Sequence, residues 1–428
     1  MKKLSLFLFL ASFLNGQEPA KPVVEDPLQM QSDIGYRMLT GQHGNINTYR
    51  SIVNLGEGPR LLQFQSTYKP PNTKLFDQFR IHGANWGDPL NTFQLNVEKS
   101  AIYRVNFQYR NLAYFNTLPS FASPQLGRLG ASSYATSQSW QDTRNRFWNL
   151  DLDLRPGRRL QPFFGIAQNT SHGLGVSPLV LDENSYPAAS RIDTGYTVFR
   201  GGMRLETELL HLTLEQGGAT FHDGTSLFNN TLNLGNRENT YFGRQLSLGD
   251  STRLYDVNGN HLYSSADLTI SPVSWLDFSA EYYFSQPKSE VRFNESARGT
   301  ILWLDTLRFA NGQQSLATGY ANQPRTAGGL TLEVRPFSRL RIIDAWQVEH
   351  MHNSGSVSFG TTLDGRALSP VNSNDRLVLR QNEQRLQAFF DVTKRFTIFG
   401  GHRYLLSLIH ISEPTRLRRI SYAVFCLK

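Results

Sequence analysis

Two short stretches hold residue types that could bind a metal ion. His350 and His352 stand two residues apart in VEHMHN, and Asp256, Asn258 and Asn260 alternate in DVNGN. A histidine pair without a third ligand is an incomplete transition-metal site, so we assign it a structural or solvent-exposed role where a strand runs into a long loop. The second stretch lacks the glutamate that completes a calcium loop, which favours an ordinary Asn-Gly turn.

Motifs of the common enzyme and cofactor classes are missing from the sequence. It contains no G-x-x-x-x-G-K-[ST], H-E-x-x-H, G-x-S-x-G, C-x-x-C or C-x-x-C-H. We therefore predict a protein that is not an enzyme, with no catalytic, cofactor-binding or metal-binding residues and no cofactor. A Ser/His pair or rim carboxylates that meet only in three dimensions are the alternative.

The composition is not typical of a soluble enzyme. Hydrophobic residues make up 39% of the 428 residues and charged residues 18%, both below the usual globular share, whereas aromatic residues reach 12%. Disordered chains are poor in aromatic residues, so this chain is expected to fold.

The first residues have the layout of a secretory signal peptide. Lys2 and Lys3 precede an apolar run from Leu4 to Leu14, which is too short to span a bilayer as a helix. We predict a signal peptide over residues 1–16 and a polar leader over residues 17–32. An exported chain of this kind is a secreted or periplasmic protein, a surface protein or an outer-membrane barrel.

Residues 33–405 show the alternation of strands. In IYRVNFQY, NLDLDLRP and GLTLEVRP, apolar residues occupy every second position, which is the period of a strand. Three stretches also repeat the pattern L-x-[LIV]-x-P-x-x-x-L, beginning at Leu152, Leu268 and Leu332. Each predicts a strand, a tight turn and a second strand, because proline already has the backbone angle that a turn needs.

Long segments rich in Asn, Ser, Gly and Thr separate these hairpins, such as residues 118–142 and 221–260. Short turns that alternate with long loops are typical of outer-membrane barrels and unusual in soluble domains. Aromatic residues near strand ends fit the girdles of such a barrel; they are Tyr114, Phe115, Phe147, Trp148, Tyr282, Tyr283 and Phe284.

The predicted fold class is all-β, a transmembrane antiparallel up-and-down β-barrel with at least about 14 strands. Its polar residues are assigned to the interior, because the outward face of each strand must meet lipid. The assigned residues are Arg104, Asn106, Gln108, Asp151, Asp153, Thr331 and Glu333. Aromatic packing in a soluble β-sandwich is the alternative explanation of the same alternation.

The last residues, 406–428, resemble the in-frame translation of a sequencing-library adapter. We interpret this segment as an adapter-derived artefact, so the barrel is expected to be incomplete after Leu405 and the segment itself unpaired. Cys426, the only cysteine, then is not native. The formal charge of +8 falls to +3 for residues 17–405, because the segment and the signal peptide carry the other charges. No nucleic-acid partner is indicated.

Residues 33–120 carry a resemblance to a known family. A Tyr-Arg start in YRSIVNLGEGPRLLQFQ, a Gly-Asp-Pro turn in ANWGDPLNTF and the hairpin KSAIYRVNFQY followed by YFN resemble the porin-like barrels of multihaem-cytochrome electron conduits. In that family the barrel sheathes a cytochrome that carries the haems. Several members have an N-terminal C-x-x-C, which this sequence lacks.

The sequence therefore predicts an outer-membrane protein of a Gram-negative-type bacterium, acting as a channel or sheath. Its expected partners are outer-membrane lipid and, if the resemblance extends to function, multihaem cytochromes. A general diffusion porin and a secreted β-rich adhesin or binding protein are the alternatives. A plugged, energy-coupled receptor is not favoured, because residues 17–32 leave no room for a plug domain.

Overall fold

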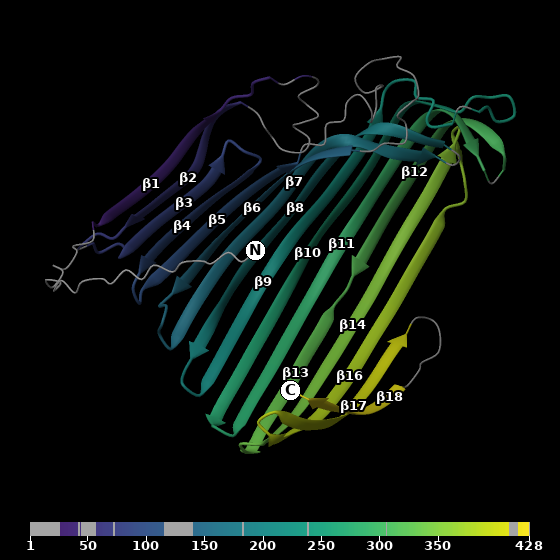
Figure 1. Cartoon of the computed structure of the whole chain (residues 1–428). Helices are drawn as coiled ribbons and strands as arrows, with labels where there is room; N and C mark the ends of the chain where they lie inside the picture. Colours follow the sequence, from purple (N-terminus) through teal and green to yellow (C-terminus); the bar gives the residue numbers. More distant parts are fainter. Residues whose placement is uncertain are drawn as a thin grey trace, which may run out of the picture.

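The computed structural model describes residues 26–41, 43, 57–71, 73–114, 140–181, 184–237, 239–304, 306–410 and 418–427. These residues form one antiparallel sheet of 18 strands (Figure 1). No helix in this described part has the length and apolar character that a membrane crossing needs. The strands are β1 (Leu28–Arg37), β2 (Gly58–Tyr68), β3 (Gln78–Trp86), β4 (Leu90–Lys99), β5 (Tyr103–Tyr114), β6 (Trp140–Leu154), β7 (Leu160–Leu181), β8 (Asn184–Glu206), β9 (Leu210–Asn229), β10 (Ser247–Val273), β11 (Leu276–Trp303), β12 (Arg308–Asn322), β13 (Arg325–Phe337), β14 (Leu340–Leu363), β15 (Arg366–Ala367), β16 (Val371–Thr393), β17 (Phe396–His410) and β18 (Arg418–Leu427).

The strands follow one another up and down across the sheet. β12 and β13 share one position, because both pair with β11 and β14 and are separated only by Gln323 and Pro324. Since β15 has only two residues, sixteen of the 18 strands count as separate crossings of the sheet. This confirms the predicted all-β, up-and-down architecture and its minimum of about 14 strands. Among the described residues no register joins β1 to β17 or β18, so the described sheet has two edges.

The three predicted repeats all form tight turns at the same edge of the sheet. The turn that contains Pro156 joins β6 to β7, the turn after Pro272 joins β10 to β11, and the turn after Pro336 joins β13 to β14. Proline is tolerated there because its missing N–H is not needed at the end of a ladder. We call this the short-turn edge; the connections after β1, β5 and β9 leave the opposite, long-connection edge.

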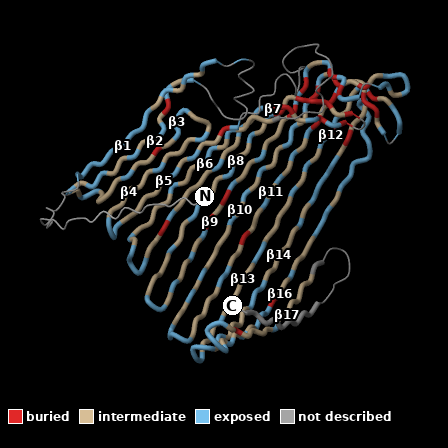
Figure 2. Tube along the Cα trace, in the orientation of Figure 1, coloured by how far each residue is buried: buried red, intermediate tan, exposed pale blue. Residues whose placement is uncertain are grey.

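The strands continue much further toward the long-connection edge than the sequence predicted. Residues 221–260, expected as a long loop, form the ends of β9 and β10 around a connection of residues 230–246. The tips enclose a small apolar core, which explains the difference, because burial stabilises paired strands over loop. Figure 2 shows buried residues gathered at these tips. The core residues are Leu179, Leu181, Tyr186, Ala188, Leu227, Leu248, Ala297 and Ile301.

Both predicted ends of the barrel domain differ from the structure. β1 begins at Leu28, inside the predicted leader. Residues 406–410 continue β17, and β18 pairs with β17 over ten residues, from Leu405 opposite Arg418 to Phe396 opposite Leu427. The expectation of an unpaired tail is therefore wrong. An alternating segment such as ISYAVFCL satisfies the backbone groups that β17 would otherwise expose at its edge. The signal peptide and residues 115–139 lie outside the described residues.

Candidate functional site

One face of the sheet carries the polar side chains; we call it the polar face. Directly paired residues of antiparallel strands point to the same side. Arg104 pairs with Asp153 and Asn106 with Asp151, and the registers continue across the sheet to the β13 residues Thr331 and Glu333. The seven residues assigned to the interior thus share one face, as the sequence predicted.

Ion pairs on the polar face reach across an intervening strand. Arg200 on β8 donates from Nη2 to Asp151 Oδ1 on β6 at 2.5 Å, and Arg204 Nη1 lies 3.0 Å from Asp153 Oδ1. β7 lies between these strands. Arg200 can cross it because the residue below is Gly165, where a Cβ would lie 2.6 Å from Arg200 Nε and 2.7 Å from Asp151 Oδ1. The missing side chain at Gly165 therefore lets Arg200 reach Asp151 across β7.

Aromatic rings lie among these charges. The guanidinium of Arg204 lies 4.3 Å from the centre of the Phe163 ring, in the geometry of a cation–π contact. Tyr263 donates from its hydroxyl to Glu215 at 2.6 Å and stacks on Tyr283 with 6.3 Å between ring centres. The polar face is thus a connected network of charged, hydroxyl and aromatic groups.

A second network lies on the polar face of β14, β16 and β17. Arg403 donates from Nε and Nη2 to the two carboxylate oxygens of Glu383, at 2.9 and 3.0 Å, and Arg385 contacts the same carboxylate. The Glu383 side chain is 4% exposed. Arg325 and Glu349 pair at 2.8 Å nearby, with more exposed side chains. Two arginines on one buried carboxylate leave this cluster positively charged.

The opposite face carries exposed apolar side chains near the short-turn edge; we call it the apolar face. On β11 its residues are Leu276, Phe278, Ala280, Tyr282 and Phe284 in succession. Large apolar residues of the other strands are exposed on the same face, which is unusual for a soluble protein. They include Leu150, Phe164, Phe199, Met203, Leu214, Leu262, Leu330, Leu332, Val348, Leu386 and Phe390. Together these side chains form the apolar belt.

The apolar belt ends abruptly. On β11 the positions after Phe284 on the same face are Gln286, Lys288, Glu290 and Arg292. The apolar stretch therefore spans about nine residues, the length that a tilted strand needs to cross the hydrocarbon core of a bilayer. Beyond it, the apolar face of β11 is polar, and only scattered apolar side chains such as Leu174 and Leu254 are exposed on that face of the neighbouring strands.

The predicted aromatic girdle is half right. Trp148, Tyr282 and Phe284 lie on the apolar face, as a girdle requires. Phe147 and Tyr283 lie on the polar face, because adjacent residues of a strand point to opposite sides. Tyr114 pairs with Thr143 on the polar face, and Phe115 lies outside the described residues.

A polar pair interrupts the belt on β14 and β16. Asp344 lies between Ile342 and Trp346 on the apolar face, and Gln384 Nε2 donates to it at 3.3 Å. Asp344 stands four residues from Leu340, where β14 begins, so it lies about 13 Å along the strand from the short-turn edge. That position lies inside the nine-residue apolar stretch, where the side-chain amide of Gln384 supplies the carboxylate with a polar partner.

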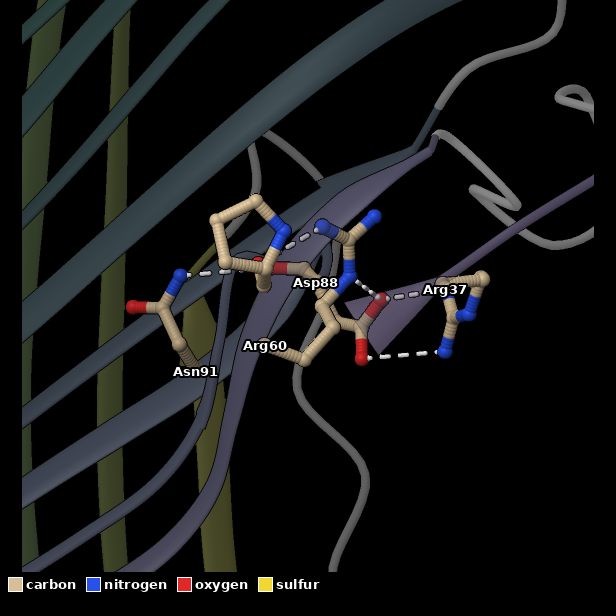
Figure 3. Close-up of polar contacts among 5 residues, drawn as sticks. Arg37, Arg60, Asp88 and Asn91 are labelled. Carbon is tan, nitrogen blue, oxygen red and sulfur yellow. Dashed lines mark hydrogen bonds and ion pairs between the residues drawn. The ribbon is translucent and has the colours of Figure 1, made fainter. Parts of the chain in front are cut away.

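A carboxylate at the long-connection edge holds the first strands together (Figure 3). Asp88 lies in the predicted Gly-Asp-Pro turn between β3 and β4. Its Oδ1 accepts from Arg37 Nη1 on β1 at 2.7 Å and from Arg60 Nε on β2 at 3.1 Å. Gly87 has a φ of 101°, and a Cβ there would lie 3.0 Å from Arg60 and from the Pro59 carbonyl oxygen. The sequence motif marked the turn, but not the two arginines that it anchors.

The two candidate metal stretches lie inside strands. His350 and His352 sit within β14, not at a loop, with 2.7 Å between their Nε2 atoms, and Arg380 Nε lies 3.3 Å from His350 Nε2. A guanidinium this close disfavours a metal cation at the pair. Among the described residues no group of three or more His, Cys, Asp or Glu side chains is placed to hold a metal.

The predicted Asn-Gly turn in DVNGN is also part of a strand, β10. Gly259 lies under the Phe221 ring of β9, which a Cβ would strike. The glycine therefore serves close packing between strands, and the ladders on both sides of β10 hold the segment extended.

No family model and no curated protein matches the chain. Similar solved structures include the ferric yersiniabactin uptake receptor FyuA from Yersinia pestis, with a TM-score of 0.41 and 11% identity over 82% of this chain and 61% of that chain. The RagAB peptide transporter gives 0.30 and 8%, over 79% and 52%. The ferric-catecholate import receptor Fiu from E. coli K12 gives 0.28 and 8%, over 81% and 68%. The chain thus spans 52% to 68% of their lengths, and TM-scores this low assign it no function.

Proposed function

We propose that the chain forms an outer-membrane β-barrel that serves as a channel or sheath. One observation carries the proposal: the two faces of the sheet have opposite chemistry over the same stretch of each strand. The apolar belt is exposed where a soluble protein would be polar, and the polar face holds linked ion pairs at the same height. A sheet with this arrangement places the belt against lipid and the ion pairs around a water-filled interior.

The size of the sheet supports an open interior. Barrels of about 16–18 strands enclose an aqueous channel, whereas barrels of about eight are filled by side chains. Of the sixteen crossings described here, fifteen lie within residues 28–410, far more than the eight of a filled barrel. Closure would also remove the two edges, whose backbone groups hydrocarbon cannot satisfy.

The finer form of the proposal is a sheath around a multihaem cytochrome. It rests on the resemblance of residues 33–120 to the barrels of electron conduits, in which the cytochrome supplies all redox chemistry and the barrel insulates and positions it. The charged polar face offers donors and acceptors for a protein surface inside the barrel. A general diffusion porin is the alternative, with the same barrel and no occupant.

Membrane fractionation tests the barrel itself. We expect the protein in the outer-membrane fraction, released by detergent and not by alkaline carbonate. It should migrate faster on gels before boiling than after, because a closed barrel stays folded in dodecyl sulfate. Recovery in the soluble periplasmic or secreted fraction would overturn the barrel and favour the β-rich adhesin.

Purification from native membranes separates sheath from porin. A sheath should co-purify with haem absorbance in a fixed ratio and conduct ions poorly in planar bilayers. A porin should carry no haem and conduct ions in steps. Each result supports one form and excludes the other.

A further inference from the structure

Three arginines stand on the apolar face beyond the apolar belt, toward the long-connection edge. Arg146 and Arg144 occupy the next two positions on that face of β6 after Trp148, and Arg191 lies on the same face of β8. All three side chains are exposed, and none forms an ion pair within the described part of the chain. Cations without partners at the border of an apolar surface are the groups that anionic lipid headgroups attract.

The arginines line one cavity of about 400 Å³. His172 of β7 also lines it, opposite Arg144 in the register. Two carboxylates are near: Asp142 lines the cavity, and Asp193 pairs with His172, with 2.9 Å between Asp193 Oδ1 and His172 Nδ1. The cavity is net positive, because three guanidinium groups face only two carboxylates. One of these carboxylates, that of Asp193, is already bound to His172.

The height of Arg146 matches a headgroup layer. Strands rise about 3.3 Å per residue, so Arg146 and Arg144 lie about 7 and 13 Å along β6 beyond Trp148, and Arg191, which is level with Asp142 in the registers, lies about 20 Å beyond the level of Trp148. At a strand tilt of about 40°, these distances correspond to about 5, 10 and 15 Å above the belt. The headgroup region of a bilayer is about 5–8 Å deep on each side, so Arg146 lies at its depth, and Arg144 and Arg191 stand above it and line the same cavity.

We propose that Arg144, Arg146 and Arg191 bind the phosphate groups of an anionic lipid in the outer leaflet, whose acyl chains lie on the belt below. Guanidinium groups bind phosphate through paired, charge-assisted hydrogen bonds. Leu150, Ile166 and Phe199 lie below the cavity on the same face and offer an apolar surface to the chains. This inference rests on the proposed membrane barrel, because it needs the belt to lie in lipid.

The test compares two triple variants of the full-length protein. R144Q/R146Q/R191Q removes the proposed site. R308Q/R366Q/R376Q removes the same charge from exposed arginines elsewhere on the long-connection side. Both are folded into detergent micelles, where gel mobility before and after boiling reports folding. Lipid A, dephosphorylated lipid A and inorganic phosphate are then titrated against each and against the wild type.

We expect the wild type and the control variant to bind lipid A, and R144Q/R146Q/R191Q to bind it at least tenfold more weakly. Dephosphorylated lipid A should bind the wild type as weakly as it binds that variant. Equal binding of lipid A by both triple variants would overturn the site. Inorganic phosphate that binds as tightly as lipid A would overturn the lipid as its ligand. Failure of all proteins to fold in micelles would instead count against the membrane barrel.

Discussion

Arg200 Nη2 lies 2.5 Å from Asp151 Oδ1, although the two residues belong to β8 and β6 and β7 runs between them. The bridge is made across Gly165, the one position where β7 offers no side chain in its path. Charges on this face are therefore matched through a glycine as well as between neighbouring strands.

Gly165→Ala should uncouple this pair. A methyl group would push aside the ends of both side chains, which are flexible, and leave the backbone in place. A double-mutant cycle with D151N and R200Q should give about 0.5–1 kcal/mol of coupling in the wild type and about zero in G165A. Urea unfolding in lipid vesicles measures it. Gly195→Ala is the control, because nothing lies within 4 Å of a Cβ there. Coupling between Asp151 and Arg200 that persists in G165A would show that the ion pair does not depend on a glycine at position 165.

Removal of acids from the polar face should shift ion selectivity. Asp151 and Asp153 balance Arg200 and Arg204, so D151N/D153N removes the carboxylate partners of two arginines on the polar face, which lines the interior of the proposed barrel. The reversal potential in a potassium chloride gradient should move toward anion preference in planar bilayers. Glu290→Gln, on the apolar face beyond the belt, should leave it unchanged. A shift of the reversal potential in E290Q, with none in D151N/D153N, would show that the polar face does not line the channel.

The Glu383 carboxylate should contribute more to stability than the more exposed Glu349. Glu383→Gln weakens two hydrogen bonds from Arg403 and leaves two arginines beside a neutral group. We expect a loss of about 1.5–3 kcal/mol in the free energy of unfolding. Glu349→Gln removes a single pair between more exposed side chains and should cost less than about 1 kcal/mol. Equal losses in the two variants would show that the burial of Glu383 does not matter.

A turn at the short-turn edge should lose stability in acid. Lys99 Nζ and the Ser100 backbone N–H each donate to Asp77 at 2.7 Å and lower the pKa of that carboxyl to about 2. Because the folded pKa is below that of the unfolded chain, the stabilisation is present above about pH 4 and is lost as the pH falls toward 2. The difference in Tm between wild type and Asp77→Asn should thus be largest near pH 7 and shrink steeply as the pH falls toward 2. A Tm difference that does not change with pH would show that the Asp77 carboxylate is not the source of the stabilisation.

Local patterns in the sequence were sufficient to predict the strands and their two faces. Alternation fixes which side chains of a strand share a side, so it predicts that Asp151, Asp153 and Arg104 face the interior without any knowledge of the strand order. The proline repeats marked three turns of one edge. Sequence patterns failed where strands continue without alternation of apolar residues, as in residues 221–260, where ladders and the small core at the tips hold the backbone extended.

The amino-acid sequence by itself determined the class of the fold, because strand period and turn chemistry are properties of neighbouring residues. Only the tertiary structure decided which charges meet. Arg200 reaches Asp151, Arg403 reaches Glu383 and Arg37 reaches Asp88 across 49, 20 and 51 residues of chain. It also decided that Arg144, Arg146 and Arg191 form one cluster. Such contacts depend on the register of strands far apart in the chain, and a shift of one residue would send each side chain to the opposite face.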